Sequence, residues 1–179
     1  LEINAKKEKN NLASIFQRSL YFMKILLWSV GKPHEPYVKE GITDFSQRIN
    51  KYFSATWQIM PPPKNAAVLQ EDTLKKAEAA LLLTQLQTDD FLVLLDERGK
   101  NFTSPQLANF IQQRANESTK RIVFLIGGAF GVDANITQRA NLVWSLSNLV
   151  FPHMLVRLIL AEQVYRACTI LRNEKYHHV

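Results

Sequence analysis

Two short apolar runs constrain the fold of this 179-residue chain more than any other feature. Residues 91–95 read Phe-Leu-Val-Leu-Leu, and residues 121–126 read Arg followed by Ile-Val-Phe-Leu-Ile. A strand that is covered on both faces has such a continuous run, whereas a half-exposed strand alternates apolar and polar residues. The sequence therefore predicts a parallel sheet with helices on both faces.

Strand-like and helix-like segments alternate along the chain. The predicted strands are residues 24–30, 56–60, 91–95, 121–126 and 142–146, and the predicted helices are residues 35–52, 72–87, 104–116, 133–141 and 153–172. Asp72 and Ser104 are expected to cap two of these helices, with Pro105 as a first helical residue. This order predicts an α/β domain with an open, mostly parallel sheet, which binds a ligand at the carboxyl ends of its strands.

The length of the chain fits one domain, which is predicted to comprise residues 23–179. Residues 1–22 are expected to be an N-terminal extension, added by an upstream start or by cloning. The formal net charge of +6 favours a polyanionic partner such as nucleic acid, although many basic proteins bind none. A single cysteine suits a reducing compartment, so we expect a cytoplasmic protein. No membrane span is expected, because Lys24 interrupts the most apolar candidate at residues 20–30.

A glycine-rich turn follows the predicted strand at residues 121–126. Gly127, Gly128 and Gly131 would let the backbone approach a ligand closely; the alternative is a tight turn without a ligand. Their spacing fits neither the dinucleotide fingerprint nor the phosphate-binding loop, which disfavours a dinucleotide-dependent oxidoreductase. Residues 96–100 are interpreted as a solvated turn. Both turns should lie at the same edge of the sheet, where a ligand would bind.

The predicted final helix carries an arginine on its apolar side. Arg157 shares a helical stripe with Ala161 and Val164, and a buried arginine needs an anionic or a carbonyl partner. Two interpretations are open: an internal ion pair, and a contact to a phosphate or a cofactor. Glu162 and Arg166 are spaced for an ion pair that stabilises the helix.

Three of the four histidines, His153, His177 and His178, lie near the end of the sequence. No cysteine or carboxylate cluster with ligand spacing accompanies them, so no metal site is predicted. Tyr176 and His177 could stack on a base and donate hydrogen bonds to a phosphate or a uracil edge. The alternative is a frayed terminus.

Motifs along residues 23–178 resemble those of the ribosomal RNA large subunit methyltransferase H family. This SPOUT-class family uses S-adenosyl-L-methionine to methylate N3 of a pseudouridine in large-subunit (23S) ribosomal RNA. The matching motifs, in the family's order and spacing, are Leu95-Asp96 with Gly99-Lys100, Ile126-Gly127-Gly128 with Gly131, Trp144-Ser145-Leu146-Ser147, Phe151-Pro152-His153, Arg157, residues 162–167 and Tyr176-His177.

The resemblance implies a SPOUT-type domain with a C-terminal trefoil knot. It also implies a homodimer that holds the target base in a cleft shared by both subunits, and recognition of rRNA in the assembled ribosome. S-adenosyl-L-methionine would be bound by the backbone of three loops, whose residues are Leu95, Gly127, Leu146, Ser147, Asn148, Leu149, Val150 and Phe151.

By the same resemblance, catalysis requires that N3 be aligned with the activated methyl group and lose its proton. Three residues are candidates for this step: His153 or His177 as the base, and Arg157 as a group that stabilises the anion. Arg157 and His177 are expected to orient the nucleotide or its phosphate, with Tyr176 stacking on the base.

Two other functions remain as alternatives. The first is a SPOUT methyltransferase acting on another RNA such as tRNA, which the absence of a separate RNA-binding module disfavours. The second is a non-catalytic ribosome-binding relative, which the intact cofactor loops disfavour. Affinity for S-adenosyl-L-methionine separates the second alternative from both methyltransferases.

Overall fold

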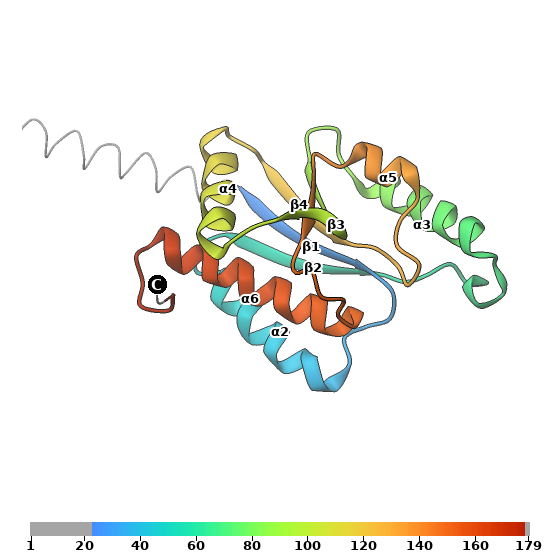
Figure 1. The fold of residues 1–179 in the computed structure, drawn as a ribbon, viewed down its shortest axis with the longest axis horizontal. Coiled ribbons are helices and arrows are strands. Elements are labelled where there is room, and N and C mark those ends of the chain that lie inside the picture. The colour runs from blue at the N-terminus through green and yellow to red at the C-terminus, as the bar shows by residue number, and fades with distance from the viewer. Residues whose placement is uncertain (1–22, 178–179) are drawn as a thin grey trace, which may run out of the picture.

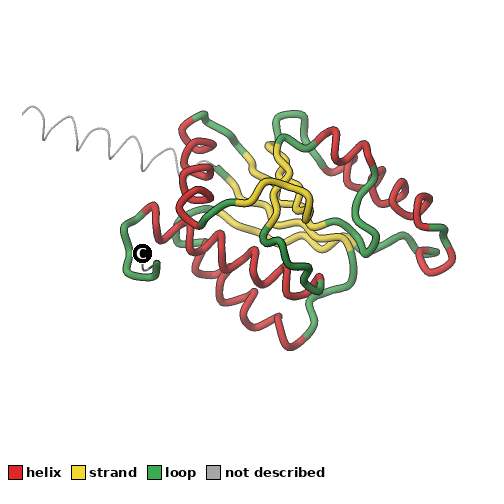
Figure 2. The backbone as a smooth tube through the Cα atoms, in the orientation of Figure 1, coloured by secondary structure: helices red, strands yellow, loops and turns green. Residues whose placement is uncertain are grey.

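The structure is a computed structural model that describes residues 23–177; the predicted extension at residues 1–22 and the last two residues lie outside this range. Its centre is one parallel sheet. The strands are β1 (Lys24–Val30), β2 (Ser54–Met60), β3 (Phe91–Asn101), β4 (Arg121–Ile126) and β5 (Leu142–Ser145), in the spatial order β2-β1-β4-β3-β5. Figures 1 and 2 show this sheet enclosed by helices, which confirms the predicted α/β architecture.

Helices cover both faces of the sheet (Figure 1). On one face, α6 (His153–Leu171) packs against α2 (Pro36–Ile49) and α4 (Ser104–Asn116). On the other face, α3 (Glu71–Gln85) contacts α5 (Ala134–Arg139), and a short 3-10 helix, η1 (Ala66–Val68), precedes α3. No helix in residues 23–177 has the length and apolar character that a membrane crossing requires.

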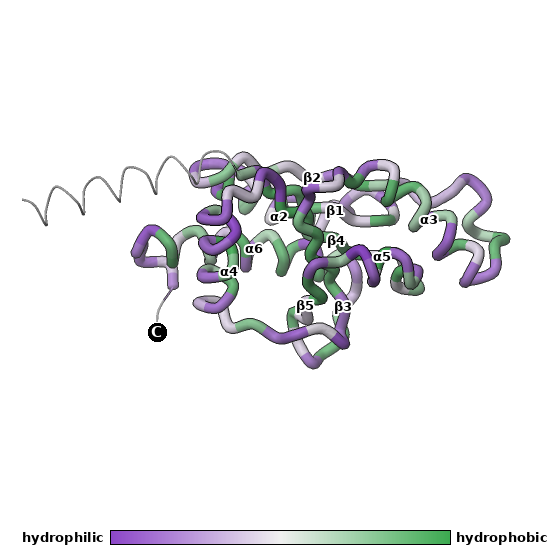
Figure 3. The backbone as a smooth tube through the Cα atoms, turned by 90° about the horizontal axis from the view of Figure 1, so that it is seen from above, coloured by the Kyte–Doolittle hydropathy of each residue, from purple (hydrophilic) through white to green (hydrophobic). Residues whose placement is uncertain are grey.

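Each face of the sheet has its own apolar core. Successive residues of β4 point to opposite faces: Phe124 packs in the core that contains residues of α4 and α6, whereas Val123 and Leu125 pack in the core that contains residues of α3 and α5. Both sets of positions must therefore be apolar, which explains the continuous run in the sequence. Figure 3 shows the hydrophobic colour concentrated along the central strands.

Both predicted helix caps are wrong by one or two residues. Helix α3 begins at Glu71 and its N-cap is Gln70, so Asp72 lies inside the first turn. Helix α4 has Thr103 as its N-cap, in a capping box in which Thr103 and Gln106 each accept a hydrogen bond from the other's backbone N–H. Ser104 is then free to donate a 2.9 Å hydrogen bond from Oγ to Gln163 on α6.

Strand β3 is longer than predicted. The segment interpreted as a solvated turn, residues 96–100, belongs to the strand, which pairs with β5 through an irregular register between Leu95 and Lys100. A Cβ at Gly99 would lie 2.7 Å from the backbone nitrogen of Trp144 on β5. The glycine is needed for this close approach of two backbones, and its presence among charged residues hid the strand from pattern analysis.

Candidate functional site

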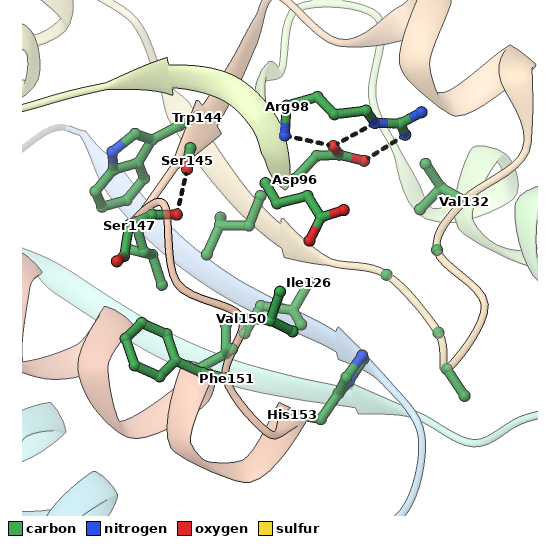
Figure 4. Close-up of a pocket in the computed structure, with 18 of the residues that line it drawn as sticks. Asp96, Arg98, Ile126, Val132, Trp144, Ser145, Ser147, Val150, Phe151 and His153 are labelled. Carbon is green, nitrogen blue, oxygen red and sulfur yellow. Dashed lines mark hydrogen bonds and ion pairs between the residues drawn. The ribbon is translucent and has the colours of Figure 1, made fainter.

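A pocket of about 460 Å³ lies at the carboxyl edge of β3, β4 and β5 (Figure 4). Three loops form its walls: the continuation of β3 from Leu95, the glycine turn after β4, and the segment that joins β5 to α6. Carboxyl ends of neighbouring parallel strands meet at one edge of a sheet, and this is where open α/β sheets bind ligands. The predicted meeting of the first two loops at one edge is therefore observed.

Most residues expected to bind the cofactor line this pocket. They are Leu95, Gly127, Leu146, Ser147, Leu149, Val150 and Phe151. Asn148 does not line it, although both of its neighbours do. Further wall residues that were not predicted as cofactor ligands include Asp96, Glu97 and Arg98, whose position directly after a buried strand was the available signal.

The glycine turn combines both interpretations made from sequence, because it is a tight turn and also a wall of the pocket. The backbone N–H of Gly131 donates a 3.1 Å hydrogen bond to the carbonyl of Gly128, and Gly131 has a φ of +82°. A Cβ at Gly127 would lie 2.6 Å from Cγ1 of Val132. A side chain at Gly127 would therefore disturb the loop itself.

Two serine hydroxyls shape the loop between β5 and α6. Ser145 Oγ donates a 2.8 Å hydrogen bond to the carbonyl of Ser147, and Ser147 Oγ accepts a 2.9 Å hydrogen bond from the N–H of Leu149. The side chains of Leu149 and Val150 are 69% and 80% exposed. These hydrogen bonds stabilise the turn of the loop, which presents two apolar side chains to the solvent beside the pocket.

His153 is the only histidine of residues 23–177 that lines this pocket. It is the first residue of α6. Burial and the nearby positive charge of Arg157 lower the pKa of His153, and a hydrogen bond with the Gly128 backbone opposes this shift only in part. The imidazole is therefore mostly neutral at pH 7 and can accept a proton.

Arg157 is only 1% exposed and does not line the pocket. Its Nε donates to Ser29 Oγ at 2.9 Å, and its Nη1 donates to the carbonyl of Lys32 at 2.9 Å and lies 3.4 Å from Nδ1 of His34. No carboxylate in the described part of the chain pairs with it, so the interpretation as an internal ion pair is wrong. The expected carbonyl partner is present, and burial lowers the pKa of this guanidinium.

Tyr176 follows α6, and its side chain packs back against the second half of this helix. Its hydroxyl donates a 3.1 Å hydrogen bond to Glu162 Oε1, and its ring lies 4.7 Å from both the ring of Tyr165 and the guanidinium carbon of Arg166. The predicted ion pair is present, since Arg166 Nε donates to Glu162 at 2.9 Å. Its role is larger than expected, because both members also contact Tyr176. For this tyrosine, the alternative of a frayed terminus does not hold.

The predicted site residues therefore form two groups. The 19 residues of α6 span about 28 Å. His153 is the first residue of α6 and lines the pocket, whereas Tyr176 and His177 follow the last residue of this helix. Neither Tyr176 nor His177 lines the pocket of its own chain.

The fold and the pocket define a class: α/β proteins that bind a small molecule in loops at the carboxyl edge of a parallel sheet. Comparison with known proteins identifies the family. The family model described as "Predicted SPOUT methyltransferase" matches residues 23–177. The "Ribosomal RNA large subunit methyltransferase H" of Cytophaga hutchinsonii is 43% identical over 156 residues, which are 87% of this chain and 100% of that protein.

The protein of the same name from Parabacteroides distasonis is 41% identical over 156 residues, which are 87% of this chain and 99% of that protein. Among solved structures, a SpoU methyltransferase from Streptomyces viridochromogenes in complex with AdoMet has a TM-score of 0.43 and 14% identity, covering 87% of this chain and 60% of that chain. This chain belongs to the SPOUT methyltransferases and, within them, to the family of ribosomal RNA large subunit methyltransferase H.

Proposed function

We propose that the protein is a cytoplasmic, S-adenosyl-L-methionine-dependent enzyme that methylates N3 of a pseudouridine in large-subunit rRNA of the assembled ribosome. The observation that carries the proposal is the pocket at the carboxyl edge of β3, β4 and β5, lined by most of the family's expected cofactor residues. The names of the relatives, each matched over 99% or more of its length, support an rRNA substrate. The net charge of +6 suits a polyanionic substrate.

The pocket fits S-adenosyl-L-methionine in size and chemistry. Its volume of about 460 Å³ lies in the range of small-molecule sites. The glycine turn exposes backbone where a Cβ would collide with neighbouring atoms, and apolar side chains such as Leu95 and Val156 complete the walls. When bound, the cofactor supplies a methyl group already activated by the sulfonium, so the protein mainly has to align the acceptor and remove its proton.

His153 is the favoured general base among the three candidates. It lines the pocket, and its lowered pKa keeps the imidazole in the neutral form, which can accept a proton. Arg157 is buried against the loop that follows β1 and acts through its neighbours rather than on the nucleotide. His177 follows α6 and does not line the pocket of its own chain.

We further propose that the enzyme is a homodimer in which the tail of one copy completes the pocket of the other. This arrangement would bring Tyr176 and His177 to the substrate despite the length of α6. The two apolar side chains beside the pocket, Leu149 and Val150, are suited to burial against a second copy.

The test is methyl transfer from labelled S-adenosyl-L-methionine to ribosomes that lack the modification, with the product nucleoside identified by mass spectrometry. The control is Gly127→Arg, which should fill the cofactor loop; its folding is checked by circular dichroism. Methylpseudouridine formed by the wild type alone is the expected result. Transfer to tRNA instead would contradict the rRNA substrate, and binding of ribosomes without affinity for the cofactor would indicate a non-catalytic relative.

A further inference from the structure

Glu78, on the inner side of α3, has a carboxyl group in direct contact with the glycine turn of the pocket. The residue is only 7% exposed. A Cβ at Gly128 would overlap Oε2 of Glu78, so this glycine leaves the space that the carboxyl group occupies. Gly128 also lines the pocket. The carboxyl group of Glu78 is thus separated from the pocket by the backbone of one glycine.

This carboxyl group has no cationic partner in residues 23–177. Lys75, which lies three residues before Glu78 and therefore on the same side of α3, pairs instead with Glu71 at 3.3 Å and Asp72 at 3.0 Å. Burial raises the pKa of Glu78, and no neighbouring positive charge opposes this shift. An unpaired carboxylate at such a position is costly, and replacement by an apolar residue would relieve the cost. Because the carboxyl group lies beside a ligand pocket, its placement indicates that its partner is a positive charge on the bound ligand.

We propose that Glu78 provides the negative charge that complements the cationic cofactor, and that it favours S-adenosyl-L-methionine over S-adenosyl-L-homocysteine. The inference rests on the proposed cofactor. The two molecules differ by the methyl group and by the positive charge of the sulfonium. A carboxylate behind the glycine turn attracts the charged form, and this attraction ends when the methyl group has been transferred.

Two other acidic residues of the pocket are less suited to this role. Asp96 is already paired with Arg98 through a 2.8 Å contact. Glu97 lines the pocket but is exposed, so that water screens its charge. Glu78 alone among these three combines burial with the lack of a cationic partner, which makes its charge effective over several ångströms.

The experiment measures the affinity of both molecules by isothermal titration calorimetry for the wild type, Glu78→Gln and Glu97→Gln. Glu78→Gln should weaken S-adenosyl-L-methionine roughly ten-fold, as expected for loss of one nearby buried charge, and change S-adenosyl-L-homocysteine less than two-fold. Glu97→Gln should leave the ratio of the two affinities unchanged. Glu78→Met serves as a second variant, and it should fold because it removes an unpaired buried acid.

Two results would overturn the inference. Equal losses of affinity for both molecules would show that Glu78 only supports the loop, and affinities for both molecules that stay at the wild-type values in both Glu78 variants would show that its charge is irrelevant. Failure of the wild type to bind either molecule is a different outcome, because it contradicts the proposed cofactor itself.

Discussion

Arg157 on α6 and Ser29 on β1 are joined by a 2.9 Å hydrogen bond inside the core, across 128 positions of sequence. The same guanidinium also binds the carbonyl of Lys32, so one side chain connects the last helix to the loop after the first strand. The position of this loop, and of the N-terminal half of α6, depends on the fork geometry that only arginine offers.

Arg157→Lys should therefore destabilise the protein although it keeps the charge. A lysine cannot serve both acceptors and would leave buried polar groups without partners, at a cost of about 3 kcal/mol. The measurement is urea denaturation followed by circular dichroism. Arg48→Lys is the control, since Arg48 forms a solvent-exposed ion pair with Asp44, and its unfolding midpoint should be nearly that of the wild type. Equal midpoints for all three proteins would contradict the role assigned to Arg157.

His153→Asn should lower kcat about 100-fold and leave the affinity for the cofactor almost unchanged, because it removes the proton acceptor but not the binding loops. In the wild type, methyl transfer should fall only at acidic pH, since the pKa of His153 is lowered from its usual value of about 6.5. Single-turnover rates between pH 5 and 9 test both statements. An unchanged rate in His153→Asn would assign the base to another group.

The lowered pKa of His153 also affects stability. The unfolded chain binds a proton below about pH 6.5 more readily than the folded chain, so the folded state loses stability as the pH falls through this value. In the variant His153→Gln, which has no titrating group at this position, this part of the pH dependence should be smaller. The measurement is the free energy of unfolding of both proteins at pH 5 and at pH 8. An equal change between the two pH values in the wild type and in His153→Gln would contradict this prediction.

Mixing of two inactive variants tests the shared site. His153→Asn damages the pocket and Tyr176→Ala damages the tail, so each homodimer should be inactive. In a mixed dimer, one site would combine an intact pocket with an intact tail, and random mixing should restore roughly a quarter of the wild-type activity. Absence of any recovery after subunit exchange, verified by mass spectrometry of the dimers, would show that pocket and tail act within one chain.

Gly99→Ala should be much more harmful than Gly41→Ala. A Cβ at Gly99 would meet the backbone of Val143 and Trp144 at 2.7 Å, which cannot move without breaking the pairing of β3 with β5. A Cβ at Gly41 would meet only the end of the flexible Leu158 side chain, and alanine favours the helix there. We expect a loss of about 2 kcal/mol for Gly99→Ala in chemical denaturation. Similar losses in both variants would contradict the role of the close approach.

Local sequence patterns predict the strands and helices of this fold well, because a strand that is buried on both faces of the sheet has a continuous run of apolar residues. The continuous run around Val93 and the one around Phe124 are both central strands. Patterns fail where tertiary contacts decide the outcome. The extension of β3 through Gly99 depends on pairing with β5, and the choice of Thr103 over Ser104 as a cap depends on Gln106 and on the contact of Ser104 with α6.

The candidate site, too, could be predicted from the sequence only in part. Most residues that line the pocket at the ends of β4 and β5 could be predicted, because they match family motifs after strand ends. The partners of Arg157 could not, since Ser29 and Lys32 lie more than 120 positions away and carry no sequence signal of their own. Glu78 was missed for a related reason. Its contact with Gly128 joins α3 to the loop after β4, and these two segments are far apart in the sequence. In addition, a single glutamate on a helix is ordinarily solvated.

The order of the strands also determines when the protein can fold during synthesis. The central pair joins Lys24 of β1 to Arg121 of β4, which are roughly 100 residues apart, and closing such a distance is slow compared with forming local contacts. Until β4 has left the ribosomal exit tunnel, β1 has only β2 beside it and exposes its other edge. During most of its translation, such a nascent chain has to be protected from aggregation. This protection is needed at the ribosome, the particle that the folded enzyme is proposed to modify.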